Sequence, residues 1–483
     1  MRQADTLLTD LLVLDRIGKD PLHRQLYRQI RSFILDGTLP PGAPLPPSRQ
    51  LARDSGLSRN TVTNAYDQLL AEGLTESHRG SGTRTIDISR SGQSGGPRRS
   101  VKKARAAGRV AQLAGSMQSS SFFGGDTLLP GFPDPREFPS KLWNRLANRA
   151  GRELSRLMPE LDIHSGYVPL RQVLAQYLRL ARGVRVDPEQ IFITAGASQS
   201  LLLLTRALTD PGDAVWLENP AYGVAKLALQ LADLEIEPAN VDAQGALPPK
   251  NPRRSPKLIY LTTSYQYPLG ITMPMSRRLQ WLDVAQQYNA WLVEDDYDGE
   301  FRYQSDPIPA LAGLMDNERT LYMGTFSKVL SPTLRMSYLV VPASAVDSIR
   351  RVYPMLGNES SVITQAVAAE FIGMGHFTKH IKRMRSLYGE RREAMVQALA
   401  QYVGIQERGL KITSGGLHIP VGMAGVDMAV FPAVTAAGLG CIPLSSHYLE
   451  APAEHGYLLG FTSREPEVID RAVRSLSDIL YAS

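Results

Sequence analysis

The sequence has a single cysteine and lacks any hydrophobic run long enough to cross a membrane. Cys441 alone cannot form a disulfide within the chain, which is typical of a reducing compartment. No apolar stretch approaches the roughly 18 residues that a membrane-spanning helix requires. The first residues lead into a leucine-rich patch that is broken by Asp10 and Asp15 and lacks a small-residue cleavage site, so we expect no signal peptide. These absences predict a cytoplasmic protein without membrane attachment.

Charge is distributed unevenly along the 483 residues, a length that favours more than one domain. Residues 1–120 hold 18 Lys and Arg against 10 Asp and Glu, a net charge of +8, whereas the remainder holds 35 against 37. A basic front end on a near-neutral body favours a polyanionic partner for the front end alone. On charge alone, a merely soluble basic domain is the alternative.

The first ninety residues carry a helical pattern that is interrupted twice. Apolar residues recur with helical spacing over residues 22–34, and prolines then force an extended loop over residues 39–47. Ser48 is predicted to cap a short helix over Arg49–Asp54, and Ser58 to cap a further helix after a tight turn. This arrangement is the one that places a recognition helix in the major groove of DNA. Two short strands, over residues 74–76 and 79–84, are predicted to follow around a glycine-rich tip.

These motifs resemble the winged helix-turn-helix of GntR-type bacterial repressors. The likeness runs over residues 20–86 and is carried in order by Pro21–Ile30, Leu45–Ala52, Leu57–Val62, Tyr66 and Arg79–Thr83. It implies that double-stranded promoter DNA is the partner. The DNA-contacting residues that it implies are Arg49, Ser58, Arg59, Thr61 and Thr63, with Arg79 and Gly80 in the wing. For any one of them, the solvated face of a small helical domain is the alternative.

Residues 88–122 lose periodicity and fill with Ser, Gly, Ala and Arg, without any acidic residue. Such a segment cannot bury enough apolar area to order itself, which predicts a flexible basic linker. The predicted domains are therefore a DNA-binding domain over residues 1–87 and a second domain over residues 123–483. The linker either touches DNA phosphates non-specifically or merely keeps the chain soluble.

From about residue 129 short apolar strands alternate with helices. The predicted strands cover residues 191–194, 214–217, 258–262, 291–294, 321–323 and 338–341, with helices such as 201–208 and 277–288 between them. This alternation predicts an α/β fold with a largely parallel sheet and helices on both faces. In such sheets the ligand site lies at the carboxyl ends of the strands.

The polar clusters of this region fall at those strand ends. Lys328 follows a strand in company with Thr325, Ser327 and Arg335, where its amine can form a Schiff base with an aldehyde while hydroxyls and a guanidinium hold an anion. An ordinary solvated lysine is the alternative. The other clusters are the helix start at Ala197 and Ser198, an aromatic ring at Tyr222, the turn around Tyr267, and the acidic run over residues 294–301. That acidic run could also be a metal site or a solvated loop, although no histidine lies near it in sequence.

The cofactor pyridoxal 5′-phosphate (PLP) requires a turn that binds phosphate, an aromatic ring that stacks on it, an acid at its ring nitrogen and a lysine that forms a Schiff base. The clusters above supply all four. Over residues 125–475 the motifs resemble fold type I aminotransferases, closest to the aminoadipate branch, with the signature Ser-Lys-x-Leu-x-Pro-x-Leu-Arg at residues 327–335. The resemblance implies an aldimine at Lys328 and Asp295, rather than its neighbour Asp296, at the pyridine nitrogen. It implies Tyr297 and Tyr267 near the ring hydroxyl and Tyr222 near the ring. The implied phosphate ligands are Ala197, Ser198, Thr325, Ser327 and Arg335.

The whole chain resembles the MocR/GabR subgroup of GntR-type regulators, including its PdxR-like members. That resemblance implies a PLP-binding transcriptional regulator rather than an enzyme, acting as a head-to-tail homodimer. Two arginines that grip a substrate carboxylate in relatives fall here on Leu458 and Val224, which removes a bidentate clamp. Two candidate effectors then remain. PLP itself is the preferred effector, and a small amine that forms an external aldimine is the alternative. An aminotransferase with a fused DNA-binding domain is the rival from another class.

Overall fold

The computed structural model describes residues 8–9, 11–18, 20–78, 82–87, 127–303, 308–314, 318–357, 360–404, 415–423 and 425–482. The chain divides into two compact units, Met1–Arg105 and Ala106–Ser483. The division falls inside the predicted linker, and all residues from 88 to 122 lie outside the described ones. Each unit is considered by itself. Within the described residues, no helix combines the length and the apolar character that a membrane crossing needs.

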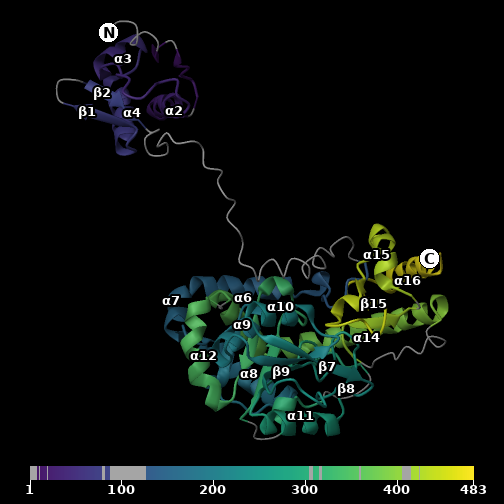
Figure 1. The fold of residues 1–483 in the computed structure, drawn as a ribbon. Helices are drawn as coiled ribbons and strands as arrows, with labels where there is room; N and C mark the ends of the chain where they lie inside the picture. The colour runs from purple at the N-terminus through teal and green to yellow at the C-terminus, as the bar shows by residue number, and fades with distance from the viewer. Residues whose placement is uncertain are drawn as a thin grey trace. The chain divides into compact units, whose positions relative to one another are not determined.

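The described part of the first unit includes the helices α2 (Leu22–Leu35), α3 (Ser48–Asp54) and α4 (Arg59–Ala71) and a β-hairpin of β1 (Thr75–His78) and β2 (Gly82–Thr85) (Figure 1). The predicted helical stripes form its core, where Leu26, Ile30, Leu51 and Val62 are fully buried. Ser58 caps α4 as predicted, because its Oγ accepts a hydrogen bond from the Thr61 amide at 3.1 Å. The prediction for Ser48 is wrong, since Ser48 is the first residue of α3 and Pro47 precedes it without a side-chain cap. Strand β1 begins one residue later than predicted, and residues 79–81 of the second predicted strand lie outside the described residues.

The centre of the second unit is an eight-stranded sheet. In spatial order its strands are β5 (Ile191–Thr194), β12 (Ser337–Val340), β11 (Thr320–Thr325), β10 (Trp291–Asp295), β9 (Pro256–Leu261), β6 (Ala214–Asn219), β7 (Glu235–Asp242) and β8 (Gly245–Ala246). All six predicted strands are present, whereas β7 and β8 were not predicted.

The sheet is parallel only in its middle. Strands β11, β10, β9, β6 and β7 run parallel, but β12 is antiparallel to both β11 and β5, and β8 is antiparallel to β7. Residues 326–336 alone connect β11 to β12, and a parallel crossover needs a dozen residues or more. The reversal therefore turns the Lys328 segment into a tight loop over the carboxyl end of β11.

Helices cover both faces of this sheet (Figure 1). Neighbouring side chains on β10 point to opposite faces of the sheet. Val293 packs on one face with α9 (Ala197–Leu208), α10 (Gly223–Leu231) and α12 (Ala343–Leu356). Leu292 packs on the other face with α11 (Met275–Gln287). Near β5 and β12 the same face as α11 is covered by α8 (Val168–Ala181), α13 (Val362–Gly373) and α14 (His376–Tyr402). The layered α/β fold is thus as predicted.

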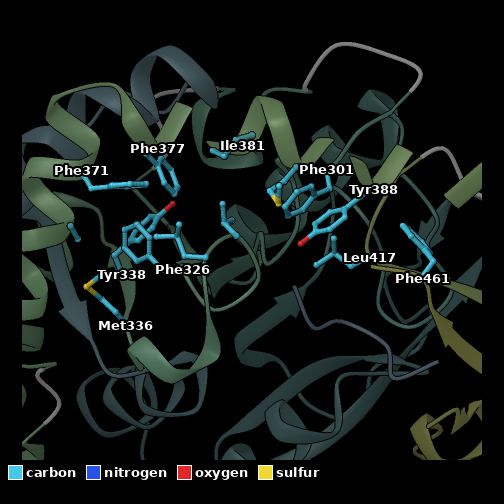
Figure 2. Packing of buried hydrophobic residues seen from close by; sticks show 14 of the residues in the cluster. Phe301, Phe326, Met336, Tyr338, Phe371, Phe377, Ile381, Tyr388, Leu417 and Phe461 are labelled. Carbon is cyan, nitrogen blue, oxygen red and sulfur yellow. The ribbon is translucent and has the colours of Figure 1, made fainter. Parts of the chain in front are cut away.

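A smaller three-stranded sheet completes the second unit, in the order β13 (His418–Gly422), β15 (Gly456–Gly460) and β14 (Ile442–Pro443). The rings of Tyr265 and Tyr267 contact His418 at the start of β13. Other aromatic contacts lie within the large core. Figure 2 shows Phe326 and Tyr338 beside Phe377, with Phe301, Tyr388 and Phe461 in a second group. The remaining helices and strands are α6 (Ser140–Arg152), α7 (Leu154–Leu157), β3 (Leu161–Asp162), β4 (Gly166–Tyr167), α15 (Asp427–Ala436), the short η8 (Leu444–His447) and α16 (Pro466–Ala482).

Candidate functional site

The exposed side of α4 in the first unit carries the predicted DNA contacts. Val62 is buried, while Ser58 and Arg59 at the start of the helix are exposed and Thr61 and Thr63 are half-buried. Arg49 is exposed on α3. Neither Arg49 nor Arg59 forms an ion pair with another described residue, so both guanidiniums are available to an anion. Arg79 and Gly80 of the predicted wing lie outside the described residues.

The ten residues predicted to hold the cofactor line one pocket of about 330 Å³ at the carboxyl ends of the parallel strands. This volume is at the small end of the range of about 300–1,000 Å³ that is usual for ligand sites. The ten are Lys328, Asp295, Tyr297, Tyr222, Ala197, Ser198, Thr325, Ser327, Arg335 and Tyr267. Eight more residues complete the wall: Pro130, Gly131, Phe132, Gly196, Val224, Thr262, Pro332 and His418.

Lys328 lies in this pocket with its amine held by backbone. Its Nζ donates a hydrogen bond to the carbonyl of Gly131 at 2.7 Å and lies 5.5 Å from the centre of the Phe132 ring. Burial lowers the pKa of the Lys328 ammonium, against the opposing attraction of Asp298 and Asp295. Gly131 has a φ of +75°, and a Cβ there would lie 2.9 Å from Nζ, so any other residue would be strained and would crowd the amine. The lowered pKa favours the neutral, nucleophilic amine.

A second group of residues forms a site for an anion at the start of α9. The amides of Ala197 and Ser198 open this helix, where backbone N–H groups lack partners within the helix. A Cβ at Gly196 would lie 4.0 Å from the guanidinium carbon of Arg335, so the guanidinium stands beside the first turn. Arg335 has left-handed backbone angles, φ 48° and ψ 51°, at the end of the loop that begins with Lys328. No described acidic side chain pairs with it.

The hydroxyls of the same loop lie beside that anion site. Thr325 Oγ1 accepts hydrogen bonds from the Ser327 amide at 3.1 Å and from Ser337 Oγ at 2.9 Å. Because those two bonds occupy its lone pairs, the Thr325 hydroxyl hydrogen is free to be donated to an anion. The arrangement of amides, hydroxyls and one guanidinium suits a phosphate group.

Adjacent carboxylates on β10 have different surroundings. Asp295 lines the pocket and accepts a short hydrogen bond from the Tyr260 hydroxyl. Burial raises the pKa of Asp295 to about 6, partly offset by that hydrogen bond. Asp296 is absent from the pocket wall and is instead bonded by Arg182 Nε at 2.6 Å and by the Tyr322 hydroxyl at 2.7 Å. Only Asp295 is thus placed to meet a ligand.

The acidic run that contains these two residues is buried rather than solvated. Glu294, Asp295, Asp296, Asp298 and Glu300 are each 8% exposed or less. The interpretation as a solvated acidic loop is therefore wrong. Among the described residues no group of His, Cys, Asp and Glu has an arrangement that could hold a metal ion, so the metal alternative gains no support there.

Tyr267 stands at the centre of a ring cluster at one side of the pocket. Its ring makes edge contacts with Tyr222 at 5.4 Å and Tyr297 at 5.8 Å, and also with His418 at 5.4 Å and His447 at 5.1 Å. The Tyr297 hydroxyl is buried without a hydrogen-bond partner among the described residues. A ligand with a ring hydroxyl would satisfy it.

The two positions where relatives carry arginines are apolar here. Val224 lines the pocket, whereas Leu458 is fully buried in β15 and is not part of the pocket wall. Among the described residues, Arg335 is the one arginine in the pocket wall.

Several pocket residues escaped prediction from the sequence. The segment from Pro130 to Phe132 has no pattern of its own, and His418 follows residues 405–414, which lie outside the described ones. Tyr260, which bonds Asp295 but is not part of the pocket wall, lies inside an apolar strand, where a tyrosine is usually a packed core residue. The fold brings each of them to the strand ends from a distant part of the chain.

Two family models match the chain. The model for class I and II aminotransferases matches residues 161–420, and the model for bacterial regulatory proteins of the gntR family matches residues 22–85. Class I and II aminotransferases use PLP. The pocket fits that group, because Arg335 has no described acidic partner, the Tyr297 hydroxyl is orphaned and Gly131 leaves room beside Lys328.

Full-length relatives share both units. The chain is 36% identical over 481 residues to a probable rhizopine catabolism regulatory protein, MocR, of Rhizobium meliloti, covering 98% of this chain and 96% of that protein. It is 32% identical over 482 residues to the pyridoxine biosynthesis transcriptional regulator PdxR of Corynebacterium glutamicum, covering 98% and 99%. Among solved structures, a Pyrococcus horikoshii kynurenine aminotransferase in complex with PMP matches with a TM-score of 0.67 at 26% identity, covering 79% of this chain and 95% of that one.

Proposed function

Because the chain belongs to the MocR-type subgroup of GntR-family bacterial regulators, in which a class I and II aminotransferase unit follows the DNA-binding unit, we propose that it is a PLP-binding transcriptional regulator. Occupancy of the pocket around Lys328 changes the affinity of the first unit for promoter DNA. The observation that carries this proposal is the meeting of all ten expected cofactor residues in one pocket.

Each part of the pocket has a task that its own chemistry supports. PLP supplies an aldehyde that condenses with primary amines. Burial lowers the pKa of Lys328, so its amine gives up a proton more readily and is available to react. Asp295 is ionised above a pH of about 6 and can then stabilise a cationic ring nitrogen. Arg335 and the first turn of α9 neutralise a phosphate.

A sensing role is favoured over transamination by what the pocket lacks. An aminotransferase needs to hold the carboxylate of its amino-acid substrate, and a desolvated charge pair of that kind contributes several kcal/mol. Val224 and Leu458 offer only apolar surface for that purpose. The aminotransferase-like unit therefore serves mainly to bind, and sustained turnover is not its task.

Two signals can drive such a regulator. The first is PLP itself, which is supported by the 32% identity to a pyridoxine biosynthesis regulator over nearly the whole chain. The second is a small amine that binds beside resident PLP. The observation in its favour is a polar residue of the pocket wall beyond the ten cofactor residues, namely His418, whose ring lies 5.4 Å from that of Tyr267.

The regulator is further proposed to act as a head-to-tail homodimer in the cytoplasm, because a dimer reads two half-sites of an operator. Sedimentation of the full chain tests the dimer. A monomeric protein that still binds its operator tightly would contradict this part of the proposal.

The cofactor proposal is tested with purified full-length protein. Incubation with PLP should produce a visible absorbance band that survives gel filtration, disappears in Lys328→Ala and persists in Lys257→Ala, a control at an exposed lysine. Absence of the band in the wild type would refute cofactor binding. Titration of the upstream promoter fragment with and without PLP then tests regulation. Multiple turnovers on any amino acid would refute the proposal that this is a regulator alone.

A further inference from the structure

Helix α6 of the second unit presents a basic face to solvent. Over Ser140–Arg152 it contains four Lys and Arg and no Asp or Glu, although residues 121–483 as a whole hold 35 against 37. Its exposed charged and amide side chains are three or four residues apart, so they lie on one side of the helix. They are Lys141, Asn144, Arg145, Asn148, Arg149 and Arg152, and together they form the α6 basic face.

The opposite side of α6 fixes the helix to the rest of the unit. Trp143, Leu146 and Ala150 are buried in the large hydrophobic core. The Trp143 ring packs edge-on against Phe371 of α13, with the ring centres 5.8 Å apart. Because these contacts set the rotation of the helix about its axis, its charged side chains are held toward solvent.

Most cations of the α6 basic face lack an acidic partner. Arg149 pairs with Glu370 of α13. Lys141, Arg145 and Arg152 form no ion pair with any other residue that the structure describes. Three positive side chains on one helix face are therefore available to an anion.

The stability of the helix itself does not explain this charge pattern. Cations near the end of a helix are favourable, which accounts for Arg149 and Arg152 in the last turn. Lys141 lies instead in the first turn, where an acid would be favoured and none is present. In addition, Lys141, Arg145 and Arg149 are spaced four residues apart, a spacing at which like charges repel. A polyanion on this face would remove that repulsion.

The phosphate backbone of duplex DNA is the polyanion whose chemistry fits this face. From Lys141 to Arg152 the helix rises by about 16 Å. Phosphates follow one another along a DNA strand about every 3.4 Å of helix axis, so several of them fit that length. The amides of Asn144 and Asn148 can donate hydrogen bonds to phosphate oxygens between the cations. Contacts of this kind hold DNA without reading its sequence.

We propose that the α6 basic face binds the phosphate backbone of DNA that flanks the operator. This inference rests on the proposed function in one respect, namely that the first unit binds promoter DNA. The 39 residues 88–126 connect that unit to Thr127 and, even when fully extended, span at most about 140 Å. DNA bound by the first unit is thereby kept at a high local concentration around the second. The flanking contact adds affinity that does not depend on sequence.

DNA binding by the full-length chain tests the proposal with two fragments and two variants. The fragments are the shortest promoter DNA that the wild type binds and the same DNA extended on both sides by unrelated sequence. The first variant combines Lys141→Gln, Arg145→Gln and Arg152→Gln. On the extended fragment it should bind more weakly, and its slope of log K against log salt should fall by about 2–3, because each lost phosphate contact removes about 0.9. On the short fragment it should bind as the wild type does.

The control variant combines Lys257→Gln, Arg471→Gln and Arg474→Gln, which removes the same charge from exposed positions on β9 and α16. It should keep the wild-type slope on both fragments. Urea unfolding at the wild-type midpoint shows that each variant is folded, as expected for substitutions at exposed sites.

Three results would overturn the α6 contact and leave the proposed function standing. The first is an unchanged slope on the extended fragment in the α6 variant. The second is an equal loss in the control variant, since net charge would then account for the effect. The third is unchanged DNA binding with loss of self-association in sedimentation, which would assign the face to a contact between two copies. Failure of the wild type to bind any promoter fragment would instead overturn the proposed function.

Discussion

Replacement of Asp295 by Asn should raise the folding stability of the PLP-free protein and lower its affinity for PLP. Asp295 is 5% exposed, and in the empty pocket its carboxylate faces one hydrogen-bond donor, Tyr260, and no bonded cation. A buried carboxylate in that situation is costly to ionise. The charged Asp295 carboxylate therefore lowers the folding stability of the PLP-free protein. A carboxylate whose role is to bind a cationic ligand is expected to have this cost.

The size of the cost follows from the pKa of this carboxyl, which is raised from 3.8 to about 6. That difference corresponds to about 3 kcal/mol of folding free energy. Between pH 3.8 and about 6 the folded chain keeps a proton that the unfolded chain has released. The contribution of the Asp295 carboxyl to folding stability is thus highest below pH 4, falls as the pH rises to about 6, and stays constant at higher pH. Asn carries no charge, so Asp295→Asn should gain up to about 3 kcal/mol at pH 8 and little at pH 4.

Urea unfolding followed by tryptophan fluorescence is the suitable assay, because all four tryptophans lie in the second unit: Trp143, Trp216, Trp281 and Trp291. Without PLP, Asp295→Asn should unfold at higher urea than the wild type. With PLP, the wild type should gain more than the variant, whose PLP affinity should be about 10- to 100-fold weaker because a charge-assisted hydrogen bond contributes about 1.5–3 kcal/mol.

The neighbouring Asp296→Asn is the matched control. Asp296 is bonded to Arg182 and Tyr322, so its replacement breaks a buried pair and should destabilise the chain by about 3–5 kcal/mol with or without PLP. The reasoning would be refuted if Asp295→Asn were less stable than the wild type without PLP at pH 8. Equal PLP affinity in the two proteins would refute the assigned role of Asp295.

Four further substitutions test other parts of the molecule. Arg335→Ala should weaken PLP binding about 10- to 100-fold in a fluorescence titration, because an anion at the start of α9 loses its cation. Gly131→Ala should cost about 1–2 kcal/mol at its φ of +75° and slow formation of the visible band, because the new Cβ would lie 2.9 Å from Lys328 Nζ. Arg59→Ala should weaken promoter binding and lower the slope of log K against log salt by about 0.9 if it contacts one phosphate. Leu458→Arg should raise the affinity for γ-aminobutyrate about tenfold in calorimetry if it restores a carboxylate clamp, and an unchanged affinity would contradict that role for position 458.

Features that depend on neighbouring residues were predictable from the sequence. The apolar runs at residues 191–194 and 291–294 form strands because short buried β-branched and leucine-rich segments favour them. The capping of α4 by Ser58 was predictable because the cap involves residues only three positions apart. The Lys328 segment was recognisable because the amine, the hydroxyls and the guanidinium all occur within residues 325–335.

Features that depend on pairing between distant segments were not predictable from the sequence. The direction of β12 follows from the short loop before it, and the core role of Tyr260 as the partner of Asp295 follows from the alignment of β9 with β10. The choice between Asp295 and Asp296 is likewise set by which face of the sheet each side chain takes. A shift of one residue would exchange those faces.

The sequence by itself therefore determined that this chain has a DNA-binding unit and a PLP-type lysine without the usual arginine clamp, since local spacing and residue chemistry carry both signals. Only the tertiary structure decided which residues surround the ring of Tyr267. His418 and His447 lie 29 residues apart in the chain and about 150–180 residues from Tyr267, and burial around the same ring is what leaves their nitrogens neutral and unpaired. No local pattern encodes that neighbourhood, because it arises from packing a separate small sheet against the strand ends of a larger one.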